Sequence, residues 1–443
     1  MCGILAVFNM RKAAELTVIG LHSQQHRAID YAGIVSSDGT FLYKECGPGT
    51  VRKVFTSEML DRLHGKHALG HTRYPTLDDD PNRINIQPLR GYWRDMPIAL
   101  AHNGNLTNTD ELARICPHRK TSLDTEFILR ILETRQEQRI EDALAETLRM
   151  LKGSFSLALL LPEMLIAARD PHGNRPLSVG VSEDIGFLVS SETCALSVLG
   201  AQSVYDVPPA AMVLIDRSGM RQISYTKIAS PLKKCSFEGI YFVHPSSDVY
   251  GVQATTFRLA LGRALEEHCP CPSANIVTEV PASGTLHAMG YATTGRSGMY
   301  MPVIFRNNYV GRTFIASSQS LRDEEVDAKF NFTKSLIVGK RIVVVDDSIV
   351  RGTTIRKIVS KLRELGALEV HVRVACPPVT HHCNYGIYTK GKDGRLIAQE
   401  MNVEEIREHI GADSIAFLPL GVLKEIWPDA ENSCFSCMTG VYW

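Results

Sequence analysis

The sequence has 443 residues, more than a single hydrophobic core usually organises, so we expect two domains of roughly 200 residues each. Lysine plus arginine equals aspartate plus glutamate at 48 residues each, which excludes the electrostatic footprint of a nucleic-acid-binding or membrane-surface protein. There is no signal-peptide pattern and no apolar stretch near the roughly 20 residues that span a bilayer. We therefore expect a cytoplasmic enzyme acting on small molecules, without nucleic acid or membrane partners.

The second residue of the chain is a cysteine. If the initiator methionine is removed, Cys2 carries both a thiol and a free amine, so nucleophile and base can belong to one residue. Taken alone, Cys2 is more simply a small apolar residue at the start of a buried strand. The rest of the sequence has to decide between these interpretations.

The first half of the sequence contains short apolar runs separated by polar turns, a pattern typical of strands packed in sheets. Examples are CGILAVF, IALAHNG and SFSLALLL. Around LIDRSGMRQISYTKIASPLKKCSF the composition turns polar and includes a glycine and a proline. We place a domain boundary there, which predicts domains over residues 1–228 and 229–443.

The second half alternates strands and helices. A β-branched run from Arg341 to Val345 predicts a strand, and a helix with apolar spacing follows and ends at Gly366. Alternating apolar residues from Leu368 to Val374 predict the next strand. This is a βαβ unit, so we expect an α/β fold with a parallel sheet.

The loop of this βαβ unit, in RIVVVDDSIVRGTT, is a candidate phosphate site. Ligands of open parallel sheets bind at the carboxyl ends of strands, where a helix N-terminus presents free N–H groups. Hydroxyls and a glycine follow the strand, and the Asp346–Asp347 pair can hold ribose hydroxyls or a hydrated Mg²⁺. The loop lacks the Gly-Lys-Ser/Thr ending of an ATP-binding loop. A polar turn with a capping threonine would explain any two of these residues, but hardly the whole string.

The sequence has eleven cysteines, too sparse for a disulfide scaffold in a chain of this length. Four of them are candidate metal ligands, and the last two form a C-x-x-C pair: Cys235, Cys383, Cys434 and Cys437. Four thiolates suit either Zn²⁺ or a [4Fe–4S] cluster, and spacing alone does not separate the two.

The segment VVDDSIVRGTT resembles the phosphoribosyl pyrophosphate (PRPP) loop of type I phosphoribosyltransferases. Its sequence is similar to that of the glutamine PRPP amidotransferase family. Further segments resemble the same family in the same order, from residue 2 to residue 442: GHTRYPT, NIQPL, AHNGNL, DTE, ARDPHGNRPL, SSETCAL, CSFEGIYF and NYVGRTFI. The resemblance implies an N-terminal-nucleophile αββα sandwich glutaminase followed by a type I phosphoribosyltransferase domain. The implied reaction makes 5-phosphoribosylamine, glutamate and pyrophosphate, the first committed step of purine synthesis.

The resemblance assigns the glutamine site residue by residue. It implies that Cys2 attacks the carboxamide of glutamine and that its own α-amine relays protons. The Asn103 side chain and the Gly104 backbone N–H would stabilise the oxyanion. Arg73 would clamp the substrate carboxylate, and Asp124 would pair with its ammonium group. Taken singly, these residues could be a surface arginine, a turn asparagine and a helix-capping aspartate.

The resemblance also assigns the transferase site. PRPP would bind at Asp346, Asp347, Ser348, Val350, Arg351, Gly352, Thr353 and Thr354. Ser283 would join the two aspartates around Mg²⁺, although beside Gly284 it could also be a turn residue. Tyr309 and Arg312 fall in the family's flexible loop, where the tyrosine helps to wall an ammonia path.

The remaining implications concern cofactors and partners. The iron–sulfur subgroup of the family has cysteines in the contexts of Cys235, Cys383, Cys434 and Cys437, which implies a structural [4Fe–4S] cluster. Glutamine and PRPP are the implied substrates. Family behaviour further implies a homo-oligomer, a dimer or tetramer, inhibited by purine nucleotides.

The chain departs from the family near residue 30. It reads HRAIDYAGI where relatives carry Arg-Gly-Gln, an acidic residue and SAGI, so Ala28, Ile29 and Tyr31 are substitutions. A lost glycine and a lost polar group close to the nucleophile motivate one alternative. In that alternative the protein is a non-catalytic sensor of PRPP or nucleotides.

The transferase half departs by losing charge that would attract PRPP. Ala282 stands where relatives have an aspartate, Asp327 stands where an arginine is common, and the segment from Arg306 has one positive charge fewer. These losses motivate a second alternative, a paralogue that aminates a different phosphoribosyl donor in a specialised pathway.

Overall fold

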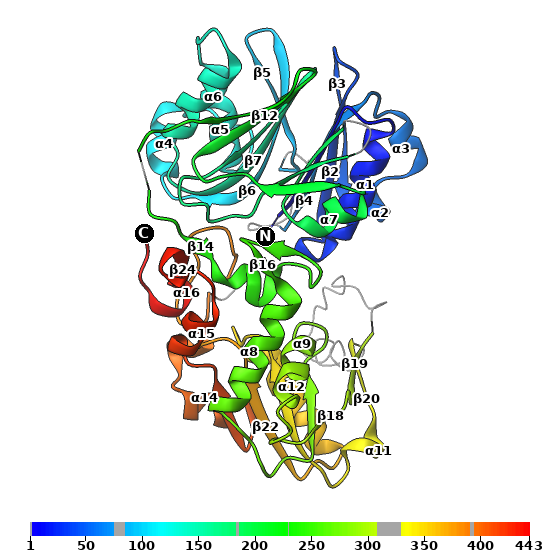
Figure 1. The fold of residues 1–443 in the computed structure, drawn as a ribbon, viewed down its shortest axis with the longest axis vertical. Helices are drawn as coiled ribbons and strands as arrows, with labels where there is room; N and C mark the ends of the chain where they lie inside the picture. Colours follow the sequence, from blue (N-terminus) through cyan, green and yellow to red (C-terminus); the bar gives the residue numbers. More distant parts are fainter. Residues whose placement is uncertain (1, 75–84, 183–185, 229, 308–328, 390–393) are drawn as a thin grey trace.

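The computed structural model describes residues 2–74, 85–182, 186–228, 230–307, 329–389 and 394–443. In Figure 1 the chain forms two bodies stacked along its long axis, and the N-terminus lies where they meet. Two sheets build the upper body, and a parallel sheet lies in the lower one.

The first sheet has seven antiparallel strands in the order β11-β9-β10-β1-β4-β2-β3. Their bounds are β1 (Gly3–Phe8), β2 (Tyr31–Ser37), β3 (Leu42–Pro48), β4 (His67–Arg73), β9 (Ser178–Val181), β10 (Phe187–Ser190) and β11 (Ser203–Asp206). The central strand β1 is buried on both faces. Ile4, Ala6 and Phe8 face the second sheet, whereas Leu5 and Val7 pack toward helices, as the two-residue period of a strand requires.

The second sheet has six antiparallel strands in the order β13-β12-β8-β7-β6-β5. Their bounds are β5 (Leu89–Trp93), β6 (Met96–Leu106), β7 (Gly153–Leu161), β8 (Met164–Arg169), β12 (Ala211–Asp216) and β13 (Gly219–Ser224). In β6, Ala99 and Ala101 face the first sheet, while Ile98 and Leu100 face helices.

Helices cover the outer face of each sheet. The helices of this body are α1 (Ala13–Ser23), the 3₁₀ turn η1 (Gln25–Arg27), α2 (Val51–Val54), α3 (Ser57–Asp61), α4 (Thr109–Ile115), α5 (Thr125–Glu133), α6 (Ile140–Arg149) and α7 (Thr193–Val198). Helices α1 and α7 pack on the first sheet, and α5 and α6 pack on the second. The result is the αββα sandwich that the family resemblance implies (Figure 1).

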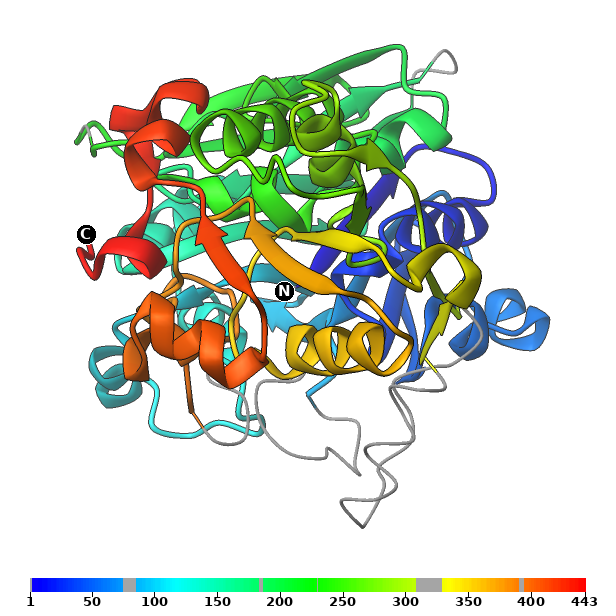
Figure 2. The same cartoon turned by 90° about the horizontal axis from the view of Figure 1, so that it is seen from below.

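The second body contains a five-stranded parallel sheet in the order β18-β17-β21-β22-β23. The strands are β17 (Ile276–Glu279), β18 (Met299–Tyr300), β21 (Arg341–Asp346), β22 (Glu369–Val374) and β23 (Ser414–Phe417). Figure 2 shows α8 (Ala254–His268) and α9 (Thr285–Ala292) on one face, with α12 (Thr353–Glu364) and α14 (Val403–Ile410) on the other. The predicted βαβ unit is therefore confirmed as β21-α12-β22, and Gly366 follows α12 at a φ of 96°.

Short elements complete the second body. They are β14 (Lys234–Cys235), the π-helical turn η2 (Glu238–Phe242), β15 (Asp248–Val249), β16 (Val252–Gln253), β19 (Ile304–Arg306), β20 (Phe330–Phe332), α11 (Lys334–Ile337), α13 (Ile397–Glu400), α15 (Leu420–Ile426), the 3₁₀ turn η3 (Ala430–Asn432), β24 (Ser433–Cys434) and α16 (Ser436–Thr439). Strand β24 pairs in parallel with β14, so the last residues return to the segment where the second body begins. The domain boundary near residue 228 stays a prediction.

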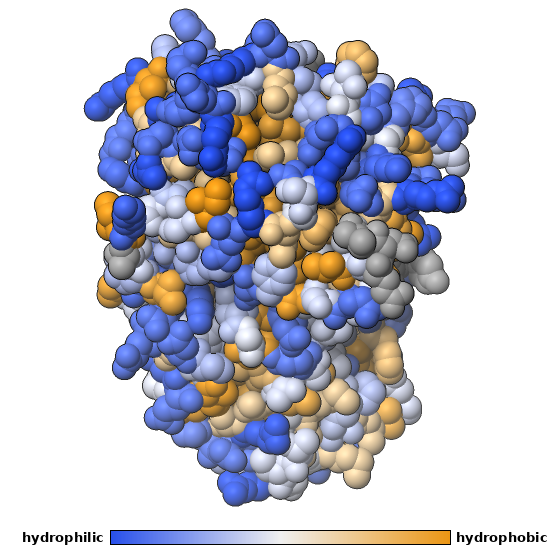
Figure 3. All heavy atoms as spheres, turned by 45° about the horizontal axis from the view of Figure 1, so that its top comes forward, coloured by the Kyte–Doolittle hydropathy of each residue, from blue (hydrophilic) through white to orange (hydrophobic). Residues whose placement is uncertain are grey.

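Figure 3 shows hydrophilic side chains over much of one face, with apolar residues in scattered patches. The longest helix in the described part of the chain, α8, has 15 residues, and none of the described helices is long and apolar enough to cross a membrane.

Candidate functional site

Cys2 immediately precedes the central strand β1, at the junction of the two bodies. Its backbone N–H donates to Asn103 Oδ1 at 3.4 Å, and its carbonyl accepts from Arg27 Nε at 2.8 Å. Asn103 lies in β6 and is 1% exposed. Its Nδ2 is buried and has no hydrogen-bond partner among the described residues. The structure therefore places an unused N–H donor beside the predicted nucleophile.

Gly104 follows in the same strand, and its environment explains why glycine occupies this position. A Cβ atom there would lie 2.1 Å from the Ser154 carbonyl oxygen and 2.8 Å from His102 Nε2. Any side chain would thus push β6 away from β7, or displace His102. Glycine keeps the backbone close to the neighbouring strand.

Asp124 caps a helix, as the alternative interpretation of the sequence predicts, and it also lies beside a histidine. Its carboxylate caps α5, accepting from Thr125 N at 2.8 Å and Leu106 N at 3.0 Å, and lies 3.6 Å from His102 Nδ1. Burial alone would raise the pKa of Asp124, but His102 and the two N–H groups hold it below its usual value. Burial opposes the charged form of His102, yet Asp124 raises the pKa of the ring.

Sequence reasoning missed His102 as a site residue, although it stands in AHNGNL directly before Asn103. The histidine is 2% exposed, and its Nε2 has no partner among the described residues. Cys2 contributes to the electrostatic environment of the ring. The only available signal was the position of His102 next to a predicted oxyanion donor.

Arg73 ends β4, one strand away from Cys2, and is 4% exposed. Its Nη1 donates to the Asn85 carbonyl at 2.9 Å. The guanidinium group lies 5.8 Å from the ring centroid of Tyr31, one of the residues that departs from the family. The substitution at residue 31 therefore borders the predicted carboxylate clamp.

The predicted phosphate loop lies at the carboxyl end of β21, between Asp346 and the start of α12 at Thr353. Gly352 precedes the helix at a φ of 77°, and a Cβ there would lie 2.6 Å from Ile397 Cδ1. Glycine is therefore needed for both conformation and space. Thr353 and Thr354 open α12, whose first N–H groups have no partners within the helix and are available to an anion.

Ser283 reaches the same place from the neighbouring strand. It follows β17, which pairs with β21, and its hydroxyl hydrogen-bonds to Asp347. Burial raises the pKa of both Asp346 and Asp347, and the charge of Asp347 raises that of Asp346 further. Two adjacent buried carboxylates with a hydroxyl fit a Mg²⁺ ion that is also held by substrate phosphates.

Tyr309 and Arg312, which the resemblance places in a flexible loop, lie outside the described residues, as do residues 308 and 327. Arg306 ends β19 with its side chain exposed.

The four predicted cluster cysteines converge. Cys235 and Cys434 are opposed in the β14–β24 pair, and Cys437 lies in α16 just beyond. Tyr385 N donates to Cys383 Sγ at 3.3 Å. Burial raises the pKa of Cys235 to about 12 and raises the pKa of Cys383 and Cys437, and the thiols interact electrostatically with one another.

All these cysteines are free, so no disulfide competes for the thiols. Convergent buried thiols are a donor set that suits an iron–sulfur cluster or zinc. The side chains do not stand in a metal-ligating arrangement of three or more groups anywhere in the described ranges. The donor chemistry therefore fits a [4Fe–4S] cluster or zinc.

The loop that carries Cys383 packs directly against the glutaminase strands. Asn105 Nδ2 donates to the Asn384 carbonyl at 2.9 Å, and Ser154 Oγ donates to the Tyr385 carbonyl at 2.6 Å. The cysteine cluster is therefore close to the predicted oxyanion strand, which the separation of these residues in sequence does not indicate.

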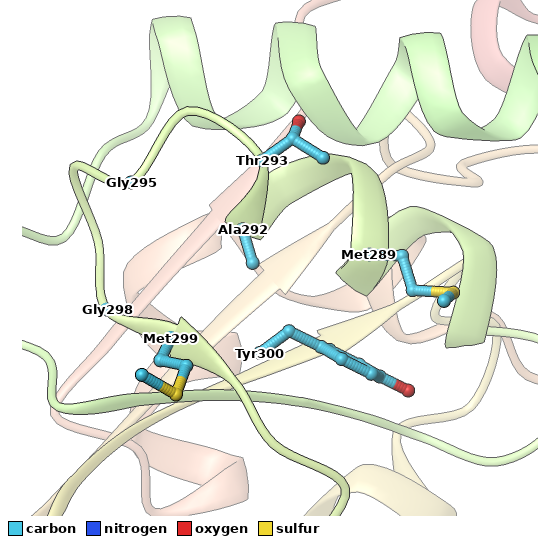
Figure 4. A pocket seen from close by; sticks show the side chains of 7 residues that line it. All are labelled: Met289, Ala292, Thr293, Gly295, Gly298, Met299 and Tyr300. Atoms are coloured by element: carbon cyan, nitrogen blue, oxygen red, sulfur yellow. The ribbon is translucent and has the colours of Figure 1, made fainter.

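A hollow of about 530 Å³ lies away from both sites. Figure 4 shows it lined by the C-terminal part of α9 and by β18, with the side chains of Met289, Met299 and Tyr300 around it. The phosphate loop adjoins the opposite end of α9, so this hollow is not the predicted PRPP site.

The fold and the two candidate sites define a glutamine amidotransferase joined to a phosphoribosyltransferase. A family model described as a glutamine amidotransferase domain matches residues 71–198. The amidophosphoribosyltransferase of Bacillus subtilis is 40% identical over 452 residues, covering 100% of this chain and 94% of the relative. That of Synechocystis is 40% identical over 455 residues, with coverage of 100% and 90%.

Solved structures agree. The glutamine PRPP amidotransferase of B. subtilis, complexed with ADP and GMP, matches with a TM-score of 0.92 at 39% identity, covering 100% of this chain and 97% of that one. The chain belongs to the amidophosphoribosyltransferase family. It is an enzyme, a glutamine-dependent glycosyltransferase of the first step of purine synthesis.

Proposed function

We propose that Cys2 hydrolyses glutamine and that the ammonia released is transferred to PRPP at the Asp346–Thr354 loop. The observation that carries the proposal is the buried Asn103 Nδ2, which has no partner among the described residues and lies in the side chain that binds the Cys2 N–H. We also propose that residues 1–228 form the glutaminase domain and residues 229–443 the transferase domain.

The nucleophile becomes complete once residue 1 is removed. The α-amine of Cys2 then takes the thiol proton, and the thiolate attacks the carboxamide carbon of glutamine. The amine returns the proton to the departing nitrogen, ammonia leaves, and water hydrolyses the thioester to release glutamate. Arg27 Nε holds the Cys2 carbonyl at 2.8 Å, which restricts the nucleophile's backbone during both steps.

The oxyanion formed in each step needs donors that are already in place. Asn103 uses its Oδ1 for Cys2 and so directs its Nδ2 toward the reacting centre. The Gly104 N–H is the second donor. Preorganised donors of this kind contribute roughly 100- to 1000-fold to kcat.

Arg73 and Asp124 are proposed to bind the two ends of the glutamine backbone. Arg73 offers a charged fork to the carboxylate. Asp124 keeps a carboxylate of lowered pKa for the ammonium group while also capping α5. Because both side chains are positioned by strand and helix ends, they need little reorganisation to bind.

In the transferase half, ammonia attacks the anomeric carbon of PRPP and the bond to pyrophosphate breaks. The phosphate groups would be held by Ser348, Gly352, Thr353 and Thr354 with Val350 and Arg351, at the N-terminus of α12. Ser283, Asp346 and Asp347 would hold Mg²⁺, which when bound neutralises charge on the pyrophosphate leaving group. Tyr309 and Arg312 are proposed to close over the substrates.

The four convergent thiols support a [4Fe–4S] cluster held by Cys235, Cys383, Cys434 and Cys437. It would join β14, β24, α16 and the Cys383 loop, which supports a structural role. We further propose a cytoplasmic location, consistent with eleven free cysteines, a homo-oligomer, and regulation by purine nucleotides.

The experiment that tests the main proposal measures glutamate release by anaerobically purified protein, with and without Mg²⁺ and PRPP, and traps phosphoribosylamine. We expect PRPP to stimulate hydrolysis and the amine to appear. If the protein does not hydrolyse glutamine, the proposed role of Cys2 is wrong. That result would favour an ammonia-dependent enzyme or a sensor. If PRPP up to millimolar concentration had no effect, PRPP would not be the phosphoribosyl donor. That result would favour a paralogue that aminates a different donor.

A further inference from the structure

Four fully buried charged residues form a continuous ionic network across the junction of the two bodies. Arg27, Arg175 and Glu192 come from the first body, and Glu238 comes from the second, as the first residue of the π-helical turn η2. All four are at most 2% exposed. Two positive and two negative charges are therefore balanced away from water, where each relies on its partners.

Glu238 fixes the orientation of Arg27. Its Oε1 accepts from Arg27 Nη2 at 3.0 Å, and its Oε2 accepts from Nη1 at 3.1 Å. A bidentate pair sets the plane of a guanidinium group. With this plane set, the Arg27 Nε–H is directed at the Cys2 carbonyl at 2.8 Å. The Glu238 carboxylate is thus one residue removed from the backbone of the nucleophile.

Glu192 makes the reciprocal contact from the first body. Its Oε1 accepts from Arg27 Nη1 at 2.6 Å, and its Oε2 accepts from His244 N at 2.8 Å and from Ser247 Oγ at 3.0 Å. Each body therefore supplies a carboxylate that binds the other. Arg27 is therefore bound by one carboxylate from each body.

Glu238 also binds a second arginine, which interacts with the cysteine cluster. Its Oε1 also accepts from Arg175 Nη1 at 3.2 Å, and the charge of Arg175 interacts with the thiols of Cys235 and Cys383. Glu238 therefore connects, through Arg27 and Arg175, the predicted nucleophile Cys2 with the predicted cluster cysteines.

The turn that carries Glu238 is itself rigidly held. Arg258 donates from Nε to the Gly239 carbonyl at 2.9 Å and from Nη2 to the Val243 carbonyl at 2.7 Å. A Cβ on Gly239 would lie 2.4 Å from the Trp427 ring. The position of the carboxylate is thus set by packing within the second body.

We propose that Glu238 is a positioning residue for Cys2, by which the transferase body holds the glutaminase nucleophile in place through Arg27. The inference rests on the proposed role of Cys2 as nucleophile. It assigns a function in glutamine hydrolysis to a residue that lies 211 positions from Arg27 in the sequence. Misplacement of reacting atoms by about 1 Å costs roughly 100-fold in rate.

The test compares Glu238→Gln with Glu266→Gln in the full-length protein. Glu266 is also fully buried in the second body, but it bonds Ser297 and has no part in the network. For E238Q we expect kcat of glutamine hydrolysis to fall about 10- to 100-fold and KM for glutamine to change little. Ammonia-dependent formation of phosphoribosylamine should stay within about twofold of wild type, because that reaction bypasses Cys2.

A second readout follows Cys2 directly. The rate at which an electrophilic glutamine analogue labels Cys2, measured by mass spectrometry, should fall in E238Q in proportion to kcat and should not fall in E266Q. Labelling of E238Q at the wild-type rate would overturn the inference. An equal loss of glutamine- and ammonia-dependent activity would also overturn it, because that is the signature of a merely structural role.

Arg27→Lys keeps the test decisive if E238Q does not fold. Lysine keeps the charge but loses the fork and Nε, so we expect the same selective loss of glutaminase activity. Where both variants fold, E238Q and R27K combined should lose no more than either alone, since they act on one contact. Additive losses contradict the inference. Failure of wild-type protein to hydrolyse glutamine or label at Cys2 would instead overturn the proposed function.

Discussion

Asn103 binds Cys2 through its oxygen, and its nitrogen has no partner in the described part of the chain. The Cys2 N–H donates to Oδ1 at 3.4 Å, and the buried Nδ2 has no partner among the described residues. An unpaired buried donor is unfavourable unless a ligand uses it. The contact thus fixes which end of the amide is left for glutamine in the proposed reaction.

Substitution of Asn103 tests this donor. We expect Asn103→Ala to lower kcat for glutamine hydrolysis by roughly 100- to 1000-fold while ammonia-dependent activity is kept. The measurement is glutamate release under saturating glutamine. A kcat within a few-fold of wild type would show that Nδ2 does not meet the oxyanion.

Gly386 lies against Gly104, the second proposed oxyanion donor. It has a φ of 112°, and a Cβ there would lie 3.2 Å from Gly104 Cα and C. We expect Gly386→Ala to move the Gly104 backbone and lower glutaminase kcat by about tenfold or more. Gly200→Ala is the matched control, because Gly200 has a φ of 74° with nothing within 4 Å of its Cβ. The control should show only a stability loss of about 1 kcal/mol; equal kinetic effects in both would contradict the prediction.

Gly352 tests the phosphate loop. An alanine there would be strained at a φ of 77° and would lie 2.6 Å from Ile397 Cδ1. We expect Gly352→Ala to raise KM for PRPP by about tenfold or more and to leave PRPP-independent glutamine hydrolysis unchanged. Initial rates over a PRPP titration measure this. An unchanged KM would place the phosphate elsewhere.

Cys434 tests the cluster. We expect Cys434→Ser to lose bound iron and inorganic sulfide, and the visible absorption of a [4Fe–4S] cluster, in anaerobically purified protein. Cys46→Ser, which changes a partly exposed thiol of β3, is the control and should keep all three. Zinc found in place of iron in the wild-type protein would contradict the cluster.

Acid sensitivity follows from buried neutral histidines. Burial lowers the pKa of His71 to about 3, against about 6.5 in the unfolded chain. The unfolded state therefore binds more protons between these values, so stability falls as pH falls below about 6.5, by roughly 1.4 kcal/mol per unit for this group. We expect His71→Gln to weaken that dependence in urea unfolding at pH 7.5 and 5.5. An identical slope in both proteins would show that His71 is charged when folded.

Local patterns predicted much of the fold. The alternation from Leu368 to Val374 predicted β22, the β-branched run predicted β21, and Gly366 predicted the end of α12. These patterns could be recognised because strand periodicity, helix periodicity and helix termination at glycine depend on residues that are close together in the sequence. The phosphate loop and the Asn103–Gly104 pair were likewise visible as contiguous strings.

Contacts between distant segments were not visible. His102 beside Asp124 and the Cys383 loop on Gly104 bring together residues whose separation carries no periodic signal. Ser283 was expected at the magnesium site only through resemblance, and its contact with Asp347 depends on the pairing of β17 with β21.

The amino-acid sequence alone specified one strand–helix–strand unit and the chemical groups available: a cysteine at residue 2, a loop of hydroxyls and carboxylates, and four thiols. The contact of Glu238 with Arg27, and through it with Cys2, arises only when the two bodies pack together. The chemistry of a side chain depends only on the residue at its own position. The partner of a buried charge depends on which surfaces pack together when the two bodies meet.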